Sequence, residues 1–425
     1  MNRPISKRDR EVLWHPYTPM KIYPEAIGII KGEGAYLIDE QGNRYLDAIS
    51  SWWVNLHGHA HPYIAGKIAQ QMQVLEHCIF AGFTHEPAVL LAERLLPLLP
   101  GEMAKIFYSD NGSTAVEVAV KMAIQYWKNI GQNGRCKIIA IEHSYHGDTF
   151  GAMSVSARSV FTEAFNPFLF DVQFIPFPSD TRAQESLDTL KKLLKSGEVA
   201  AFIAEPLVLG SGGMLMYSAA VLEQLFSICK QHEVLIIADE VMTGFGRSGT
   251  LFACDQATTM PDIICLSKGI TGGFLPMGVT ATTQEIFDAF YNDDRSKMLY
   301  HGHSYTANAT ICAAALASLN LTLSEGCADA RQMIAGMHNR FLQEIKKHEH
   351  VSSVRQTGTI LAMDLKSDSQ SYHASIRDKI YNFFLERKII LRPLGNIIYI
   401  LPPYCITADE LNRIYGAILE LLEIL

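Results

Sequence analysis

The chain has 425 residues, of which 48% are hydrophobic and 19% are charged, and this composition argues against a disordered or fibrous protein. Its 36 lysines and arginines stand against 44 aspartates and glutamates, which gives a formal charge of −8. The chain has no excess of cationic side chains to bind nucleic-acid phosphates, so we expect a protein that acts on small molecules. Its length predicts two or three domains.

The N-terminal segment has no features of an export signal. MNRPISKRDREVLWHPYTPM is charged and interrupted by prolines, and no run of eighteen apolar residues follows it anywhere. The eight cysteines stand singly, without the C-x-x-C pairs of a metal or redox site. We therefore expect a cytoplasmic protein whose cysteines are small buried hydrophobic residues.

The order of the predicted helices and strands divides the chain into three parts, at 1–60, 61–315 and 316–425. The first part is irregular, apart from a hairpin that turns at Gly42 and Asn43. The second alternates helices, such as 114–128 and 218–232, with aliphatic strands at 105–110, 137–142, 200–207, 234–240 and 262–268. Strands that are apolar at consecutive positions predict an α/β fold with a mostly parallel sheet covered by helices on both faces.

The third part has a different order of predicted helices and strands. A long amphipathic helix is followed by a strand at 360–365, a helix near 373–386, a strand at 397–401 and a terminal helix. This order predicts a smaller α+β unit. The N-terminal 60 residues are expected to contribute to this unit and to the substrate site.

Ligands of open parallel sheets bind at the carboxyl ends of the strands, where this chain places Asp239 and Lys268. A lysine there is costly to bury as an ammonium, and such a lysine can act as a Schiff-base nucleophile. A solvent-exposed lysine is the alternative for the residue taken alone. Pyridoxal phosphate requires both a lysine and a carboxylate for its ring nitrogen, which favours a catalytic pair.

A phosphate site is expected at Gly112 and Ser113, which lead from a strand into a helix. The free N–H groups at such a helix start attract anions, although many turns of this composition are only caps. Thr114 and Glu117 have the spacing of a capping box.

Two other patterns are weaker. Residues 244–249, GFGRSG, match G-x-G-x-x-G, but they do not open a helix directly, so a nicotinamide-dependent oxidoreductase is disfavoured. His57, His59, His61, His301 and His303 lack carboxylate or cysteine partners at ligand spacing, so no metal site is predicted.

Aromatic residues and one arginine suggest a substrate pocket. Tyr17, Trp52 and Trp53 concentrate aromatic surface in the irregular N-terminal part, where core packing is the alternative. Arg392 lies between two apolar segments, and either a substrate carboxylate or an internal salt bridge fits its guanidinium.

Together these motifs resemble the class III, fold-type I pyridoxal-phosphate aminotransferases over essentially the whole chain. The resemblance is carried by LIIADEVMTGFGRSGTLFA followed by PDIICLSKGITGG. It implies pyridoxal 5'-phosphate as cofactor, with Lys268 as the covalent anchor, Asp239 at the ring nitrogen and Gly112 and Ser113 at the phosphate. It further implies that Tyr145 and Val241 pack on the two faces of the ring, and that Ser304 of the second subunit of a homodimer completes the phosphate site.

WHPYT, DAISSWWVNLHGHAHP, SVSARS and LRPLGNIIYILPPY resemble one branch of this family. Its members transfer an amino group from S-adenosylmethionine to 8-amino-7-oxononanoate in biotin biosynthesis. This implies a catalytic role for Tyr17 and a carboxylate-binding role for Arg392. It implies a substrate site formed by Tyr17, Trp52, Trp53, Tyr145, Lys268, Gly302, Arg392 and Tyr399.

Two alternatives remain within the family. Some members of the branch use lysine as donor, and these tend to have Phe in place of Tyr17 and to lack the second tryptophan, so Tyr17 and Trp53 favour S-adenosylmethionine. An ω-amino-acid or ornithine-type aminotransferase is the other alternative, and these lack the SSWW and WHPYT patterns. The chain also departs from many class III members, which have Gln where Met242 stands.

Overall fold

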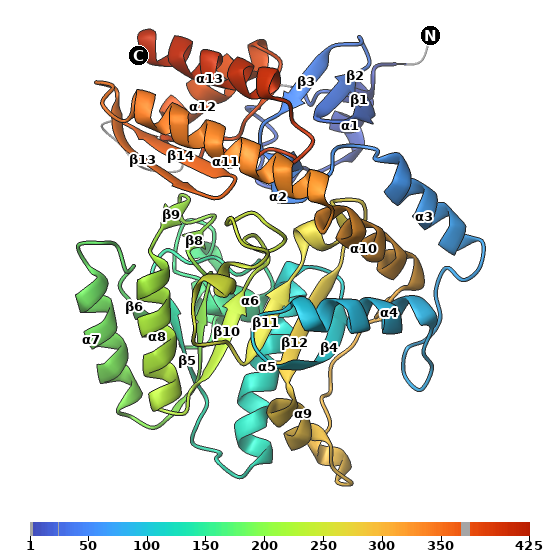
Figure 1. The fold of residues 1–425 in the computed structure, drawn as a ribbon, viewed down its shortest axis with the longest axis vertical. Helices are drawn as coiled ribbons and strands as arrows, with labels where there is room; N and C mark the ends of the chain where they lie inside the picture. The colour runs from blue at the N-terminus through green and yellow to red at the C-terminus, as the bar shows by residue number, and fades with distance from the viewer. Residues whose placement is uncertain (1–2, 24, 367–374) are drawn as a thin grey trace.

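The computed structural model describes residues 3–23, 25–366 and 375–425. A seven-stranded sheet forms the centre of the larger part (Figure 1). Its order is β4 (Met103–Ser109), β12 (Gly278–Thr283), β11 (Ile263–Leu266), β10 (Leu235–Asp239), β7 (Val199–Ala204), β5 (Lys137–Ile141) and β6 (Gln173–Ile175). Only β12 runs antiparallel to its neighbours, so the predicted mostly parallel α/β sheet is confirmed.

Both faces of this sheet are buried, as the consecutive apolar residues predicted. In β10, Leu235 and Ile237 belong to one hydrophobic cluster, and Ile236 and Ala238 belong to another on the opposite face. Helix α5 covers the first face and α8 the second. The helices of this part are α3 (Pro62–Met72), α4 (Glu86–Leu95), α5 (Gly112–Asn129), α6 (Phe150–Val155), α7 (Ala183–Leu194), α8 (Ala219–Gln231), α9 (Gln284–Phe290) and α10 (Ala309–Thr322).

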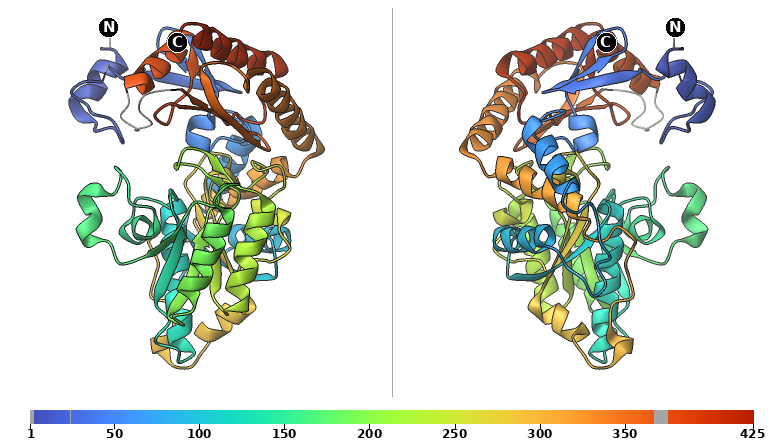
Figure 2. Two further views of the ribbon diagram at one scale, coloured as in Figure 1. Left: turned by 90° about the vertical axis from the view of Figure 1, so that its left-hand side faces the viewer. Right: turned by 90° about the vertical axis from the view of Figure 1, so that its right-hand side faces the viewer.

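The two ends of the chain lie together at one end of the molecule (Figures 1 and 2). β15 (Ile389–Ile390) pairs in parallel with β3 (Arg44–Asp47). In the same sheet β3 lies next to β2 (Tyr36–Asp39), and β2 lies next to β1 (Ile29–Glu33). β2 and β3 pair antiparallel, which confirms the predicted hairpin at Gly42. The three-part division at about residues 60 and 315 stays a prediction.

The C-terminal elements follow the predicted order. They are α11 (Glu325–Ile345), β13 (Val351–Thr357), β14 (Ile360–Leu365), α12 (Ser375–Glu386), β16 (Ile397–Ile400) and α13 (Ala408–Glu423). The start of the helix predicted near 373–386 lies outside the described residues. Short elements complete the chain: α1 (Ile5–Val12), β8 (Val208–Leu209) and β9 (Leu215–Met216).

The SSWW segment, α2 (Ser50–Trp53), has an unusual backbone. Its four residues have φ angles of 52°, 45°, 70° and 73°, which is the left-handed region. Its hydrogen bonds nevertheless have helical spacing, because Trp53 N donates to Ile49 O and Val54 N donates to Ser50 O. Each non-glycine residue in this conformation costs roughly 1–2 kcal/mol, so the surrounding structure must hold the turn.

Two expectations were wrong. Helix α5 is capped by Asn111, whose side chain accepts from Thr114 N while Thr114 Oγ1 accepts from Asn111 N. Thr114 therefore lies inside the helix, and Glu117 accepts instead from Gly151 N at 2.6 Å. The second expectation fails only in part: the cysteines are all free and four are buried as expected, but Cys136 and Cys405 are exposed because neither lies on the apolar face of a strand or helix.

Among the described helices, none is by itself long and apolar enough to cross a membrane. α10 and α11 meet the same length and hydropathy criteria only as a pair, and they meet at a bend of 67°.

Candidate active site

The carboxyl ends of the large sheet converge on one cavity of about 570 Å³. Asp239 ends β10, Lys268 follows the neighbouring β11, and Gly112 follows β4, which is separated from β11 by β12, so three strand ends on the same side of the sheet supply three of the predicted groups. Eleven of the predicted site residues line the cavity: Tyr17, Trp52, Trp53, Gly112, Ser113, Tyr145, Asp239, Val241, Lys268, Arg392 and Tyr399.

Lys268 is the only lysine among the described residues that line the cavity. Its backbone has φ 42°, and its ammonium lies 4.9 Å from the centre of the Trp53 ring. Burial lowers the pKa of Lys268, and the carboxylates of Asp239 and Glu205 oppose this shift. A lysine that loses its proton more readily than usual is suited to nucleophilic and general-base chemistry.

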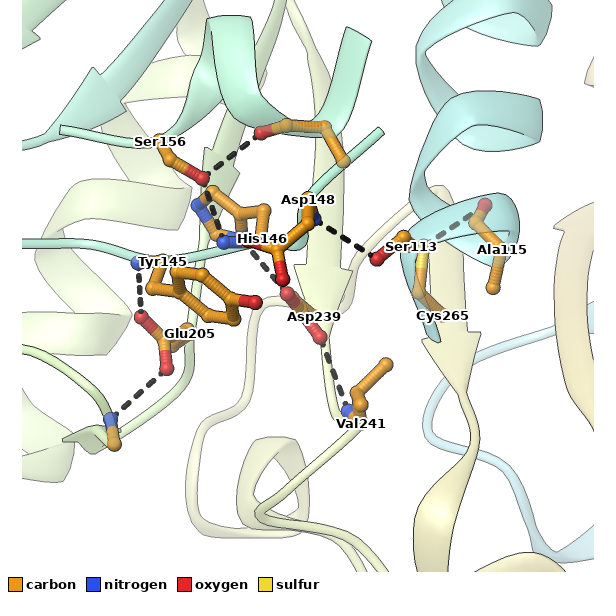
Figure 3. A network of polar contacts seen from close by, with 12 residues as sticks. Ser113, Ala115, Tyr145, His146, Asp148, Ser156, Glu205, Asp239, Val241 and Cys265 are labelled. Atoms are coloured by element: carbon orange, nitrogen blue, oxygen red, sulfur yellow. Dashed lines mark hydrogen bonds and ion pairs between the residues drawn. The ribbon is translucent and has the colours of Figure 1, made fainter. Parts of the chain in front are cut away.

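Asp239 is a buried carboxylate with two fixed hydrogen bonds (Figure 3). Oδ1 accepts from Val241 N at 3.1 Å, and Oδ2 lies 2.7 Å from His146 Nδ1. Nε2 of this buried histidine has no hydrogen-bond partner in the described part of the chain. Since a carboxylate fixed on two sides keeps its other lone pairs for a ligand, Asp239 can face a cationic nitrogen in the cavity.

A second buried carboxylate, Glu205, joins two loops at the cavity. Its oxygens accept from Tyr145 N and Gly210 N, both at 2.9 Å (Figure 3). Burial raises the pKa of Glu205 to about 7; Asp239 adds to the shift and His146 opposes it. The sequence marks Glu205 only as the residue after a strand, and it marks His146 only as the neighbour of Tyr145.

The start of α5 forms the opposite wall. Gly112 and Ser113 stand in the first turn, where backbone N–H groups have no acceptor within the helix. A methyl group at Gly112 would lie 2.8 Å from Val241 Cγ1, and one at Gly147 would lie 2.1 Å from Ser113 Oγ. Because both glycines permit a close approach of backbone, this corner fits a compact anion.

At the mouth of the cavity, aromatic rings surround the arginine. Tyr17 contacts Trp52 and Phe161 edge-to-face, at 5.5 and 5.7 Å between ring centres, and its hydroxyl donates to Asp148. The Arg392 guanidinium lies 5.0 Å from the centre of the Trp52 ring and donates to Tyr17 O at 3.3 Å.

The alternative for Arg392, an internal salt bridge, does not occur within the described residues. Asp148 and Phe161 were missed because neither lies at a strand end, and their only signal is that Asp148 belongs to the HSYHGDT motif and Phe161 closely follows SVSARS.

The inner wall is apolar. Trp53 is 3% exposed, and its ring lies edge-to-face with Tyr399 at 6.0 Å. Met242 also lines the cavity and is buried. A methyl group at Gly210 would lie 2.5 Å from the Met242 sulfur, so the thioether packs directly on that backbone. Tyr145 completes the wall, and burial raises its pKa, with the Tyr17 hydroxyl adding to the shift.

Gly302 and Ser304 do not line this cavity in the single chain. Both are exposed, and Ser304 O lies 2.6 Å from His77 Nε2. Their assignment to the site of a second subunit stays a prediction. Among the described residues, no group of three or more His, Cys, Asp or Glu side chains could hold a metal ion.

The GFGRSG segment lies between β10 and a short 3₁₀ helix, Ala253–Gln256. Its glycines therefore open no helix, as the dinucleotide motif would require.

Comparison with known proteins identifies the family. The aminotransferase class-III family model matches residues 20–422, and the chain belongs to this family. A relative from Synechococcus elongatus, named adenosylmethionine-8-amino-7-oxononanoate aminotransferase, is 48% identical over 97% of this chain and 98% of its own.

Solved structures agree as well. The crystal structure of an adenosylmethionine-8-amino-7-oxononanoate aminotransferase from Methanocaldococcus jannaschii is 40% identical, with a TM-score of 0.91 over 98% of both chains. An amine transaminase from an uncultivated Pseudomonas species, in a form with bound pyridoxal phosphate, is 32% identical. Its TM-score is 0.89 over 96% of this chain and 97% of that one. The predicted aminotransferase fold and activity class are confirmed.

Proposed function

We propose that this aminotransferase moves an amino group from S-adenosylmethionine to 8-amino-7-oxononanoate, giving 7,8-diaminononanoate for biotin biosynthesis, with pyridoxal 5'-phosphate as cofactor. The observation that carries this proposal is a single cavity with Lys268 and Asp239 at its inner end and Arg392 among aromatic rings at its mouth. A keto acid with an aliphatic chain and a distal carboxylate matches such a trough.

The residues of the cavity fit the cofactor. Lys268 would hold its aldehyde carbon, Asp239 its ring nitrogen, and the start of α5 its phosphate. Tyr145 and Val241 would pack on the ring. The fit is supported by the close approach of Gly112 and Gly147 to their neighbours and by the lone pairs of Asp239 that no donor among the described residues occupies.

When bound, pyridoxal phosphate supplies an electrophilic carbon and a ring that accepts electrons. The protein's own part is acid–base chemistry and orientation. In the first half of a ping-pong cycle Lys268 Nζ would remove the proton from the carbon that bears the amine and pass it to the cofactor, and in the second half it would move a proton the opposite way, onto the carbon that receives the amine. His146 fixes the orientation of Asp239, and Trp53 shields the Lys268 amine from bulk water.

The aromatic mouth suits both substrates. The sulfonium of S-adenosylmethionine is attracted to the faces of Tyr17 and Trp52, and the Arg392 guanidinium binds the carboxylate of the keto acid. Met242 presents no hydrogen-bond donor where many relatives have Gln, so this wall of the cavity is apolar.

The working unit is proposed to be a cytoplasmic homodimer in which Gly302 and Ser304 reach the partner's cavity. The segment that carries them is rich in exposed aromatic residues, since Tyr291 is 78% exposed, Tyr300 62% and Tyr305 64%. Exposed apolar surface of this kind is typical of a subunit interface.

The donor is tested by half-reactions. The purified holoenzyme is mixed with S-adenosylmethionine, lysine or ornithine alone, and the near-visible absorption of the bound cofactor is followed. We expect S-adenosylmethionine to remove this absorption and 8-amino-7-oxononanoate to restore it. Loss of absorption with lysine or ornithine, and not with S-adenosylmethionine, would contradict the proposal.

The role of Arg392 predicts a selective defect. Arg392→Ala should raise the KM for 8-amino-7-oxononanoate by about tenfold to a hundredfold, the loss expected for a charge-assisted hydrogen bond. The KM for the donor should change far less. Arg387→Ala is the matched control, because that guanidinium also stacks on a ring, Phe383 at 3.5 Å, but lies outside the cavity. Equal effects of Arg392→Ala on both substrates would refute this role.

A further inference from the structure

The left-handed turn, residues 50–53, is built from four consecutive residues that are not glycine. Such residues persist in this conformation only where neighbouring groups fix them. Two sets of hydrogen bonds hold the turn, one on each side.

Asp47 holds the first side. It ends β3, and its side chain is fully buried. Oδ1 accepts from Ile49 N at 3.1 Å, and Oδ2 accepts from Ser51 Oγ at 2.9 Å. His59 Nε2 lies 2.9 Å from the same Oδ2, so these three polar contacts of the carboxylate are with the turn or with the loop that follows it.

Ser50 holds the second side. Its hydroxyl donates to Leu401 O at 2.7 Å and accepts from Arg247 Nη2 at 2.8 Å. Ser50 and Arg247 are both buried. The turn is thus fixed to the strand that precedes it, to the segment after β16 and to the GFGRSG segment.

The turn presents one tryptophan to each charged end of the cavity. Trp53 lies beneath the ammonium of Lys268 at 4.9 Å, and Trp52 lies beneath the guanidinium of Arg392 at 5.0 Å. Both rings form part of the cavity wall.

We propose that Asp47 is a positioning residue for the reaction. It touches neither Lys268 nor Arg392, and it acts by holding the left-handed turn that sets Trp52 and Trp53 against both. The inference rests on the proposed function, because its kinetic effect is measured on the proposed substrates. The predicted position of the rings is independent of which substrates the enzyme uses.

The test compares Asp47→Ala with Asp39→Ala in the holoenzyme. Asp39 is the matched control, a buried carboxylate in the same sheet that holds a turn through Asn43 N and Gln41 N but does not line the cavity. Two quantities are measured: the KM values for both substrates, and the quenching of tryptophan fluorescence by iodide.

We expect Asp47→Ala to raise the KM for 8-amino-7-oxononanoate by about tenfold and to make Trp53 accessible to iodide. Asp39→Ala should lower the melting temperature and leave both quantities unchanged. An unchanged KM in Asp47→Ala, or the same rise in Asp39→Ala, would overturn the proposal.

A rescue variant separates positioning from general damage. Glycine adopts the left-handed conformation without strain. Asp47→Ala combined with Ser51→Gly should therefore bring the KM most of the way back to its original value and again protect Trp53 from quenching by iodide. A double variant no better than Asp47→Ala would contradict the proposal. If Asp47→Ala does not fold, Asp47→Asn, which keeps the acceptor for Ile49 N, should give a smaller rise in KM, and no rise would overturn the proposal.

The two proposals fail separately. If the unaltered enzyme converts neither proposed substrate, the proposed function is wrong, and the fluorescence comparison still decides the role of Asp47. If the unaltered enzyme is active and Asp47→Ala behaves like Asp39→Ala, only the role of Asp47 is wrong.

Discussion

Lys268→Ala should reduce transamination by about 10⁴-fold or more, because it removes the nucleophile and the general base together. Lys268 is the only lysine among the described residues of the cavity wall, so no neighbouring amine can replace it. The variant should still bind pyridoxal phosphate through the start of α5 and Asp239. Borohydride treatment followed by mass spectrometry of the intact chain should find the cofactor attached to the unaltered protein and not to the variant.

The chain offers a close control for this experiment. Lys388 Nζ also lies 4.9 Å from the centre of an aromatic ring, that of Tyr45, but outside the cavity. Lys388→Ala should keep both activity and covalent attachment. Turnover at the normal rate in Lys268→Ala, or borohydride attachment in that variant, would mean that another group carries the chemistry.

The catalytic pair could be predicted because it depends on strand order alone. Asp239 and Lys268 each follow an aliphatic strand, and parallel neighbours bring their carboxyl ends to one edge. The antiparallel β12 was not predicted. Its sequence, GVTATT, carries no signal of direction, and its place between β4 and β11 depends on pairings distant in the chain.

The surroundings of the pair could not be predicted, because they are set by tertiary contacts. His146 lies 93 positions from Asp239 in the chain, and Glu205 lies 60 from Tyr145. Neither of these contacts between residues far apart in the chain follows from the local sequence pattern. The left-handed turn is a sharper case, since SSWW has no glycine and its conformation is imposed by Asp47, Arg247 and Leu401. In this turn the local preference and the structure disagree, and two of its four residues, Trp52 and Trp53, line the cavity.

Asp239→Asn should lower kcat by about 10³-fold, the scale expected when a preorganised charge is removed from a buried position. The amide keeps the shape of the side chain but loses the negative charge that Asp239 directs at the cavity, fixed by His146 and Val241. The proposed contacts of both substrates lie at Arg392, Tyr17 and the tryptophans. The KM values for both substrates should therefore change little. Single-turnover rates with saturating donor should show the whole defect.

Asp262→Asn supplies the control for Asp239→Asn. Asp262 precedes β11 at the opposite end of the same strands, where it accepts from Ile236 N at 2.8 Å and pairs with Lys230. Its loss should lower the melting temperature and leave kcat unchanged. If the two variants lost activity equally, the defect would come from weakening of the sheet. If Asp239→Asn changed KM and not kcat, its carboxylate would bind substrate rather than stabilise charge during the reaction.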